Sequence, residues 1–134
     1  MYKNILVPVA LDHERDVATA LGIAEALASE GATITALTVV EAVPSYIMAS
    51  FPENQSERNR SSALDALKAE LGTSVAKPVV VTGHAARSII DYAEGHEVDC
   101  IVIASHRPGF QDFFLGSTAA RVVRHAPCAV HVVR

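Results

Sequence analysis

IVIASHRPGFQDFFLGSTAARVVRHAPCAVHVVR, residues 101–134, is the stretch of sequence that decides the fold. Its first four residues are a continuous apolar run rich in β-branched side chains, which is typical of a strand buried on both faces. Residues 119–126 have the spacing of a helix, and residues 128–133 return to an apolar strand pattern. The stretch therefore predicts a strand, a loop, a helix and a second strand in that order.

The loop inside this stretch, residues 105–115, is longer than a plain connection, and long ordered loops in compact domains are often functional. It is followed by Gly116, Ser117 and Thr118, directly before the helical segment. Small residues let backbone N–H groups approach a ligand, and the N-terminus of a helix favours an anion. These residues suit half of a phosphate site. Alternatively, Ser117 is only the N-cap of the helix and Gly116 only a turn residue.

The composition is that of one globular domain, expected to span residues 1–134, because half of the residues are hydrophobic and 19% are charged. The net charge of −4 argues against a nucleic-acid or anionic-membrane surface. The apolar runs are shorter than a bilayer span, and the N-terminus does not have the pattern of a secretory signal. We therefore expect no membrane partner and a cytoplasmic protein.

The whole chain alternates strand and helix patterns. Strands are predicted at residues 2–9, 33–40, 78–81, 100–104 and 128–133. Helices are predicted at residues 17–28 and 56–71, ended by Gly31 and Gly72, then after Gly83 and after residue 118. This alternation predicts an α/β fold with an open, mostly parallel five-stranded sheet and helices on both faces. In such sheets ligands bind at the carboxyl ends of the strands, where the strand order reverses.

Residues 41–55 are predicted to form an irregular loop with two prolines, and Tyr46, Ile47, Met48 and Phe51 make it unusually apolar. We favour a loop that folds back onto the core or a subunit interface; the alternative is a flexible lid over the site. Motifs of other nucleotide proteins and hydrolases are absent from the sequence, since no G-x-x-x-x-G-K-[ST], G-x-G-x-x-G or G-x-S-x-G occurs.

Three segments together resemble the universal stress protein family: MYKNILVPV (1–9), ASHRPGFQDFFLGST (104–118) and VVRHAPCAVHVVR (122–134). The family signature is commonly G-x-x-G-x9-G-[ST]. Here Ala104 and Arg107 stand where the two early glycines usually stand, and the loop from Arg107 to Gly116 is one residue shorter. A loop with S-H-R-P resembles one branch of the family. The resemblance implies a Rossmann-like sheet, of the adenine nucleotide α-hydrolase-like kind, with strand order 3-2-1-4-5.

The resemblance also implies a site for ATP or a related adenine nucleotide, with or without Mg²⁺. Pro8, Val9 and Ala10 would lie near the base and ribose, and Val39 would meet adenine through its backbone. The full implied site comprises Pro8, Val9, Ala10, Val39, Ile103, Ala104, His106, Arg107, Gly109, Gly116, Ser117 and Thr118. Family members usually carry Asp at the position of Ala10, and Asp12 offers a carboxylate two residues further on. The Arg107 guanidinium either pairs with phosphate oxygens or is a solvated loop side chain.

The last strand is a near-continuous apolar edge, and an uncovered edge of this kind invites pairing with another chain. We therefore predict a homodimer through Ala129, Val130, His131, Val132 and Val133, as the resemblance also implies. Alternatively, His131 and Arg134 blunt this edge. The expected function is nucleotide binding in stress response or signalling, with at most weak hydrolysis or autophosphorylation because no general base is evident. The alternative is a dimeric interaction module whose degenerate pocket binds no nucleotide.

The sequence also holds three histidines and two cysteines whose chemistry bears on function. His13, His84 and His106 each follow a predicted strand, but the first and third strands should be about 10 Å apart, so we predict no metal site. Cys100 and Cys128 open the last two strands. They are either a redox pair or, as we prefer, buried thiols.

Overall fold

The computed structural model describes residues 1–11, 17–105 and 115–134, which form a parallel sheet of five strands in the order β3-β2-β1-β4-β5. The strands are β1 (Tyr2–Pro8), β2 (Ala28–Glu41), β3 (Lys77–Gly83), β4 (Cys100–Ala104) and β5 (Ala129–Val133). Both the predicted fold class and the strand order are confirmed. The expectations for Asp12, His13, His106, Arg107 and Gly109 lie outside the described residues.

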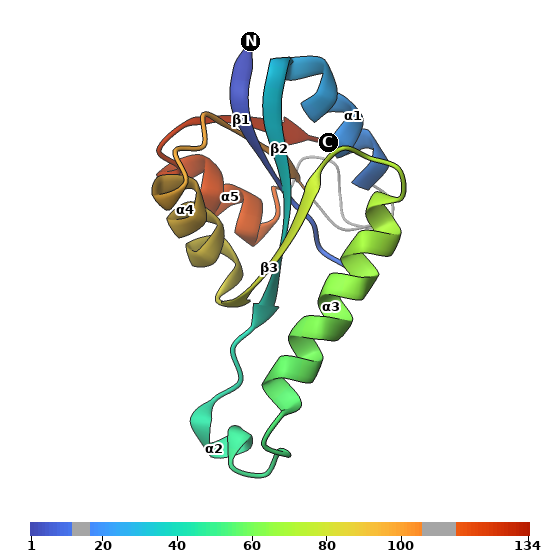
Figure 1. The fold of residues 1–134 in the computed structure, drawn as a ribbon. Coiled ribbons are helices and arrows are strands. Elements are labelled where there is room, and N and C mark those ends of the chain that lie inside the picture. Colours follow the sequence, from blue (N-terminus) through green and yellow to red (C-terminus); the bar gives the residue numbers. More distant parts are fainter. Residues whose placement is uncertain (12–16, 106–114) are drawn as a thin grey trace.

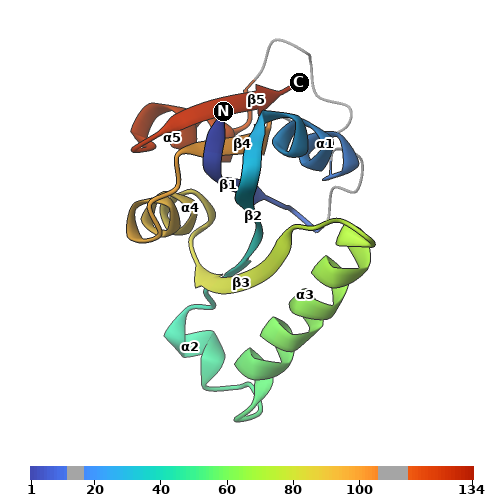
Figure 2. The ribbon, with the colours of Figure 1, turned by 45° about the horizontal axis from the view of Figure 1, so that its top comes forward.

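Helices cover both faces of the sheet (Figures 1 and 2). They are α1 (Val17–Leu27), α2 (Ser45–Met48), α3 (Gln55–Leu71), α4 (Ala85–Gly95) and α5 (Ser117–His125). Consecutive strand residues point to opposite faces, so Ile5 packs with α1 and α3 while Leu6 packs with α4 and α5. Both side chains are fully buried, which makes β1 the centre of the two cores.

The end of α1 differs from the prediction. The helix ends at Leu27, and the chain goes directly into β2 at Ala28, which pairs with Tyr2. The register then jumps, because Asn4 pairs with Thr33, and Gly31 lies in this irregular part with a φ of 78°. The prediction that Gly31 ends the helix is therefore wrong, although its left-handed backbone does require glycine. Gly72, with a φ of 53°, caps α3 as predicted.

The segment between β2 and α3 does not fold back onto the core. It contains the short helix α2, and Figure 1 shows it beyond the carboxyl ends of β2 and β3. The Tyr46 side chain is 79% exposed, and Phe51 is also exposed. The expectation of packing against the core is wrong, because β2 continues to Glu41 and the segment begins beyond the sheet. A contact with a second subunit and a role as a lid both stay predictions.

The opposite end of the sheet is fixed by Asp99, which precedes β4. Its carboxylate accepts hydrogen bonds from the backbone N–H groups of Lys3 at 2.8 Å and Asn4 at 2.9 Å. The Asn4 side chain in turn donates to the carbonyl of His96 at 2.7 Å. These contacts hold β1 beside β4, the neighbours between which the strand order reverses. In the part of the chain described, no helix is both long and apolar enough to cross a bilayer.

Candidate functional site

A pocket of about 520 Å³ opens at the carboxyl ends of β1, β2 and β4 and is bordered by α4 and the start of α5. β1 is paired with β2 on one side and with β4 on the other, and the connections from these strands leave to opposite faces. This is the point at which parallel α/β sheets bind ligands, because the diverging loops leave a crevice. The strand order alone therefore places the pocket between the ends of β1 and β4.

The pocket brings together the described residues of the predicted nucleotide site. It is lined by Pro8, Val9, Ala10, Val39, Ile103, Ala104, Gly116, Ser117 and Thr118. The remaining three predicted residues, His106, Arg107 and Gly109, are outside the described part of the chain. The role of each of these residues toward a ligand stays a prediction.

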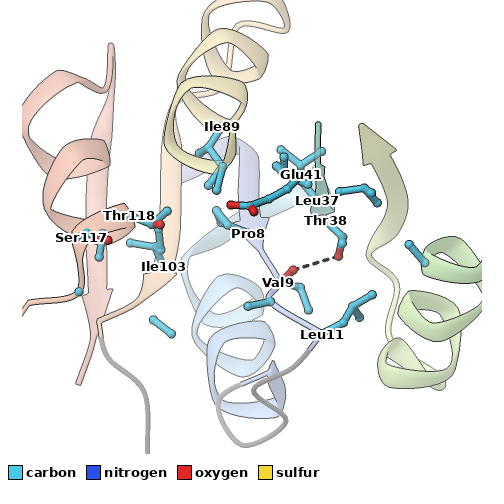
Figure 3. Close-up of a pocket in the computed structure, with 18 of the residues that line it drawn as sticks. Pro8, Val9, Leu11, Leu37, Thr38, Glu41, Ile89, Ile103, Ser117 and Thr118 are labelled. Carbon is cyan, nitrogen blue, oxygen red and sulfur yellow. Dashed lines mark hydrogen bonds between the residues drawn. The ribbon is translucent and has the colours of Figure 1, made fainter. Parts of the chain in front are cut away.

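The β1 side of the pocket is held in place by β2. The N–H of Val9 donates to the carbonyl of Leu37 at 2.8 Å, and the hydroxyl of Thr38 donates to the carbonyl of Val9 at 2.9 Å (Figure 3). Both Val9 and Thr38 are buried. These two bonds hold the backbone of Val9, the residue after β1, against β2. The next residue, Ala10, is exposed and lines the pocket. Sequence reasoning did not find Thr38.

The α5 side of the pocket offers a helix start. Gly116 is the N-cap residue, with a φ of −57° and a ψ of 153°. Because glycine has no side chain, it does not cap the N–H groups of the first turn. Ser117 is already the first helical residue, so the alternative of Ser117 as the N-cap is wrong. The N–H of Gly116 donates to the carbonyl of Ser105, and that of Ala120 donates to the carbonyl of Gly116 at 2.8 Å.

This geometry suits an anion. The first N–H groups of an α-helix have no acceptor within the helix, and the dipole makes this end positive. Here residues 117–119 belong to the first turn of α5, and all three line the pocket. The pocket therefore has an end at which backbone N–H groups can bind negative charge.

The walls between these two sides are mainly apolar and include Leu37, Val39, Ile89 and Ile103. Among the described lining residues, Glu41 is the single ionisable one. Sequence reasoning missed Glu41 as a site residue. A signal was available, because Glu41 directly follows the predicted strand 33–40 and so had to lie at the carboxyl edge of the sheet.

The histidines do not gather at this pocket as far as the structure describes them. His84 is the exposed N-cap residue of α4 and is not part of the pocket lining. No group of three or more His, Cys, Asp or Glu suited to a metal ion occurs within residues 1–11, 17–105 and 115–134.

The two cysteines lie near each other, because Cys100 is the first residue of β4 and Cys128 directly precedes β5. Cys100 pairs in register with Ala129, the residue after Cys128, and both thiols are free. Burial, together with nearby Cys128 and Asp99, raises the pKa of Cys100 to about 11. Burial also raises the pKa of Cys128, with a contribution from Asp99. Cys100 is buried and Cys128 is half-buried, and neither has the lowered pKa that reactive cysteines need, so this environment suits structural thiols rather than a redox pair.

The fold and the pocket define an α/β protein with a ligand site at the reversal point of a parallel sheet. All 134 residues match the model of the universal stress protein family, so the chain belongs to that family. A universal stress protein of Thermus aquaticus, in the QAH/OAS sulfhydrylase 3′ region, is 32% identical over the full length of both chains. The solved structure of universal stress protein UspA from Lactobacillus plantarum is 30% identical, with a TM-score of 0.68 and 99% and 98% of the two chains covered.

Two more distant solved structures that share the fold are complexes with nucleotides. One is a universal stress protein in complex with cAMP, 17% identical over 99% of this chain and 97% of that one, with a TM-score of 0.63. The other is the universal stress protein from Archaeoglobus fulgidus in complex with dAMP, 18% identical over 99% and 98% of the chains, with a TM-score of 0.57.

Proposed function

We propose that this universal stress protein binds ATP or a related adenine nucleotide in the pocket at the carboxyl ends of β1, β2 and β4. The observation that carries the proposal is that one pocket joins an apolar slot to the N-terminus of α5. A nucleotide needs both features, because its base is flat and largely apolar whereas its phosphates require hydrogen-bond donors. The cAMP and dAMP complexes of two proteins with this fold support the same ligand class.

In this proposal each side of the pocket has its own task. Pro8, Val9 and Ala10 lie near the base and ribose, and Val39 meets adenine through its backbone. Ile103 and Ala104 form a wall, and Gly116, Ser117 and Thr118 bind phosphates through N–H and hydroxyl groups. His106, Arg107 and Gly109, which precede α5 in the sequence, complete the phosphate side. Mg²⁺ would be bound mainly through phosphate oxygens, as is usual for this ion.

The protein is proposed to bind the nucleotide with at most weak hydrolysis or autophosphorylation, in stress response or signalling in the cytoplasm. Fast phosphoryl transfer needs groups that position the nucleophile at the phosphate. The single ionisable side chain among the described lining residues is Glu41, and Figure 3 shows it entering from β2, whereas Ser117 and Thr118 lie on the α5 side of the pocket. Its position favours a role toward the nucleoside end.

The protein is further proposed to form a homodimer through β5. This strand lies at the end of the strand order, and its Ala129 and His131 are exposed while Val130 and Val132 are half-buried. Exposed strand edges tend to pair with another chain, and pairing across a two-fold axis would close the assembly at two copies.

Calorimetric titration of ATP and Mg²⁺ into protein freed of bound nucleotide tests the proposed function. We expect saturable one-site binding in the micromolar range. An absence of heat, together with an unchanged melting temperature at millimolar ATP, would contradict it. That result would favour the second candidate, a dimeric interaction module with a degenerate pocket, which is motivated by Ala10, Ala104 and Arg107 at positions that usually hold Asp, Gly and Gly.

A further inference from the structure

The carboxylate of Glu41 enters the proposed nucleotide pocket from the end of β2. Glu41 is the last residue of this strand and is paired in register with Gly83 of β3. The next residue, Ala42, donates its N–H to the carbonyl of Gly83 at 3.2 Å. The backbone on both sides of the Glu41 side chain is therefore held to β3, so the side chain starts from a fixed point at the pocket.

Figure 3 shows where this carboxylate lies. It extends from β2 into the middle of the pocket, with Ile89 on one side of it and Pro8 on the other in that view, while Ser117 lies well away from it. Leu37 and Ile103, two more apolar side chains, line the same pocket. The slot around Glu41 thus has the apolar walls that suit a flat base. The N–H donors that suit phosphates are at the start of α5.

The charge of Glu41 agrees with this division of the pocket. A carboxylate next to phosphate oxygens would repel them, whereas beside a base it meets neutral donors and acceptors. An ionised carboxylate can only accept hydrogen bonds. It therefore attracts a base edge that carries an amino group and disfavours an edge that presents an oxygen at the same position. Hydrogen bonds of this charge-assisted kind are among the stronger ones in proteins.

We propose that Glu41 accepts a hydrogen bond from the exocyclic amine of the bound base and thereby selects a 6-aminopurine over a 6-oxopurine. This inference rests on the proposed nucleotide function and adds a residue that determines the base. It assigns the specificity to a side chain on β2, separate from the phosphate-binding end of the pocket.

The test compares the dissociation constants of ATP and ITP, which differ in the group at purine position 6 and in the proton on N1, for the wild type and for Glu41→Gln. The wild type should bind ATP about tenfold more tightly than ITP, as expected for loss of one hydrogen bond to a charged group. The glutamine amide can donate as well as accept, so Glu41→Gln should reduce or invert this ratio. Glu70→Gln, which changes an exposed residue of α3, is the matched control and should keep the wild-type ratio.

The possible outcomes separate this inference from the proposed function. An unchanged ratio in Glu41→Gln, or equal weakening of ATP and ITP, would overturn the assignment of Glu41 while leaving nucleotide binding intact. A wild type that binds neither nucleotide would overturn both proposals. Glu41→Ala provides a second variant, whose side chain neither donates nor accepts a hydrogen bond. Its dissociation constants for ATP and ITP should become nearly equal. Melting curves of both variants should match the wild type, because Glu41 is exposed at a strand end.

Discussion

The hydroxyl of Thr38 donates a buried hydrogen bond of 2.9 Å to the carbonyl oxygen of Val9, and this bond joins the residue after β1 to the interior of β2. Together with the bond from the Val9 N–H to the Leu37 carbonyl, it extends the contact between the two strands past Pro8. The part of the pocket nearest β1 therefore depends on a side chain of β2.

Replacing Thr38 with Val should destabilise the protein. The valine keeps the shape of the side chain but leaves the Val9 carbonyl buried without this donor, so the free energy of unfolding should fall by roughly 1–3 kcal/mol. Urea denaturation monitored by circular dichroism measures the change. Thr82→Val, at an exposed position of β3, is the control and should change stability by less than about 0.5 kcal/mol. Equal urea midpoints for Thr38→Val and Thr82→Val would show that the hydrogen bond of Thr38 does not contribute to stability in this way.

Replacing Ser117 with Asp should separate folding from ligand binding. A carboxylate in the first turn of α5 interacts favourably with the helix dipole, so stability should stay the same or rise by about 0.3–1 kcal/mol. The same charge would repel phosphate, so ATP affinity should fall at least about tenfold. Ser61→Asp, on the exposed side of α3, should leave ATP binding unchanged. Wild-type affinity in Ser117→Asp would mean that phosphates bind elsewhere.

The raised pKa of Cys100 predicts a loss of stability in alkali. Its thiol titrates at about 11 in the folded protein, compared with 9.0 for an unperturbed cysteine. Between these pH values the unfolded chain has released the proton while the folded chain keeps it. The contribution of Cys100 to stability is thus complete below pH 9 and is lost as the pH rises toward 11.

The corresponding measurement is the urea midpoint from about pH 8 to about pH 10.5. The urea midpoint should fall more steeply with rising pH for the wild type than for Cys100→Ala, whatever the difference between the two midpoints at neutral pH. Parallel curves would contradict the assignment of this titration to Cys100.

The proposed dimer predicts a specific response to a charge on β5. In a two-fold arrangement the same exposed residues of both strands approach each other, and like charges on facing strands repel. His131→Glu should therefore shift the sedimentation coefficient from dimer to monomer at micromolar concentration, whereas His84→Glu at the N-cap of α4 should not. A wild type that sediments as a monomer at high micromolar concentration would rule out the dimer.

Local pattern was enough to predict some elements. The boundaries of β4 were predicted correctly because Cys100–Ala104 is a short apolar strand between polar segments. The end of α1 was not, since apolar residues continue at helical spacing to Ala28, whereas pairing of Ala28 with Tyr2 draws that residue into β2. Pairing with a distant strand cannot be read from a local pattern. The strand order itself came from the family resemblance.

The pocket shows the same division between local and long-range information. Ser117 and Thr118 could be identified from the sequence because they adjoin a visible helix start. Thr38 could not, because its partner is the backbone of Val9, 29 residues earlier in the chain. Glu41 belongs to β2, whereas the sequence pattern places it at the start of the irregular segment 41–55.

The most direct test of the account is a titration of ¹⁵N-labelled protein with ATP and, separately, with adenosine, followed through backbone amide resonances. If phosphates bind at the start of α5, ATP should shift the amides of Ser117 and Thr118, while adenosine should shift those around Val9 and Val39 and leave the α5 amides in place. Saturating ATP that leaves the Ser117 and Thr118 amides unmoved would contradict the proposed site.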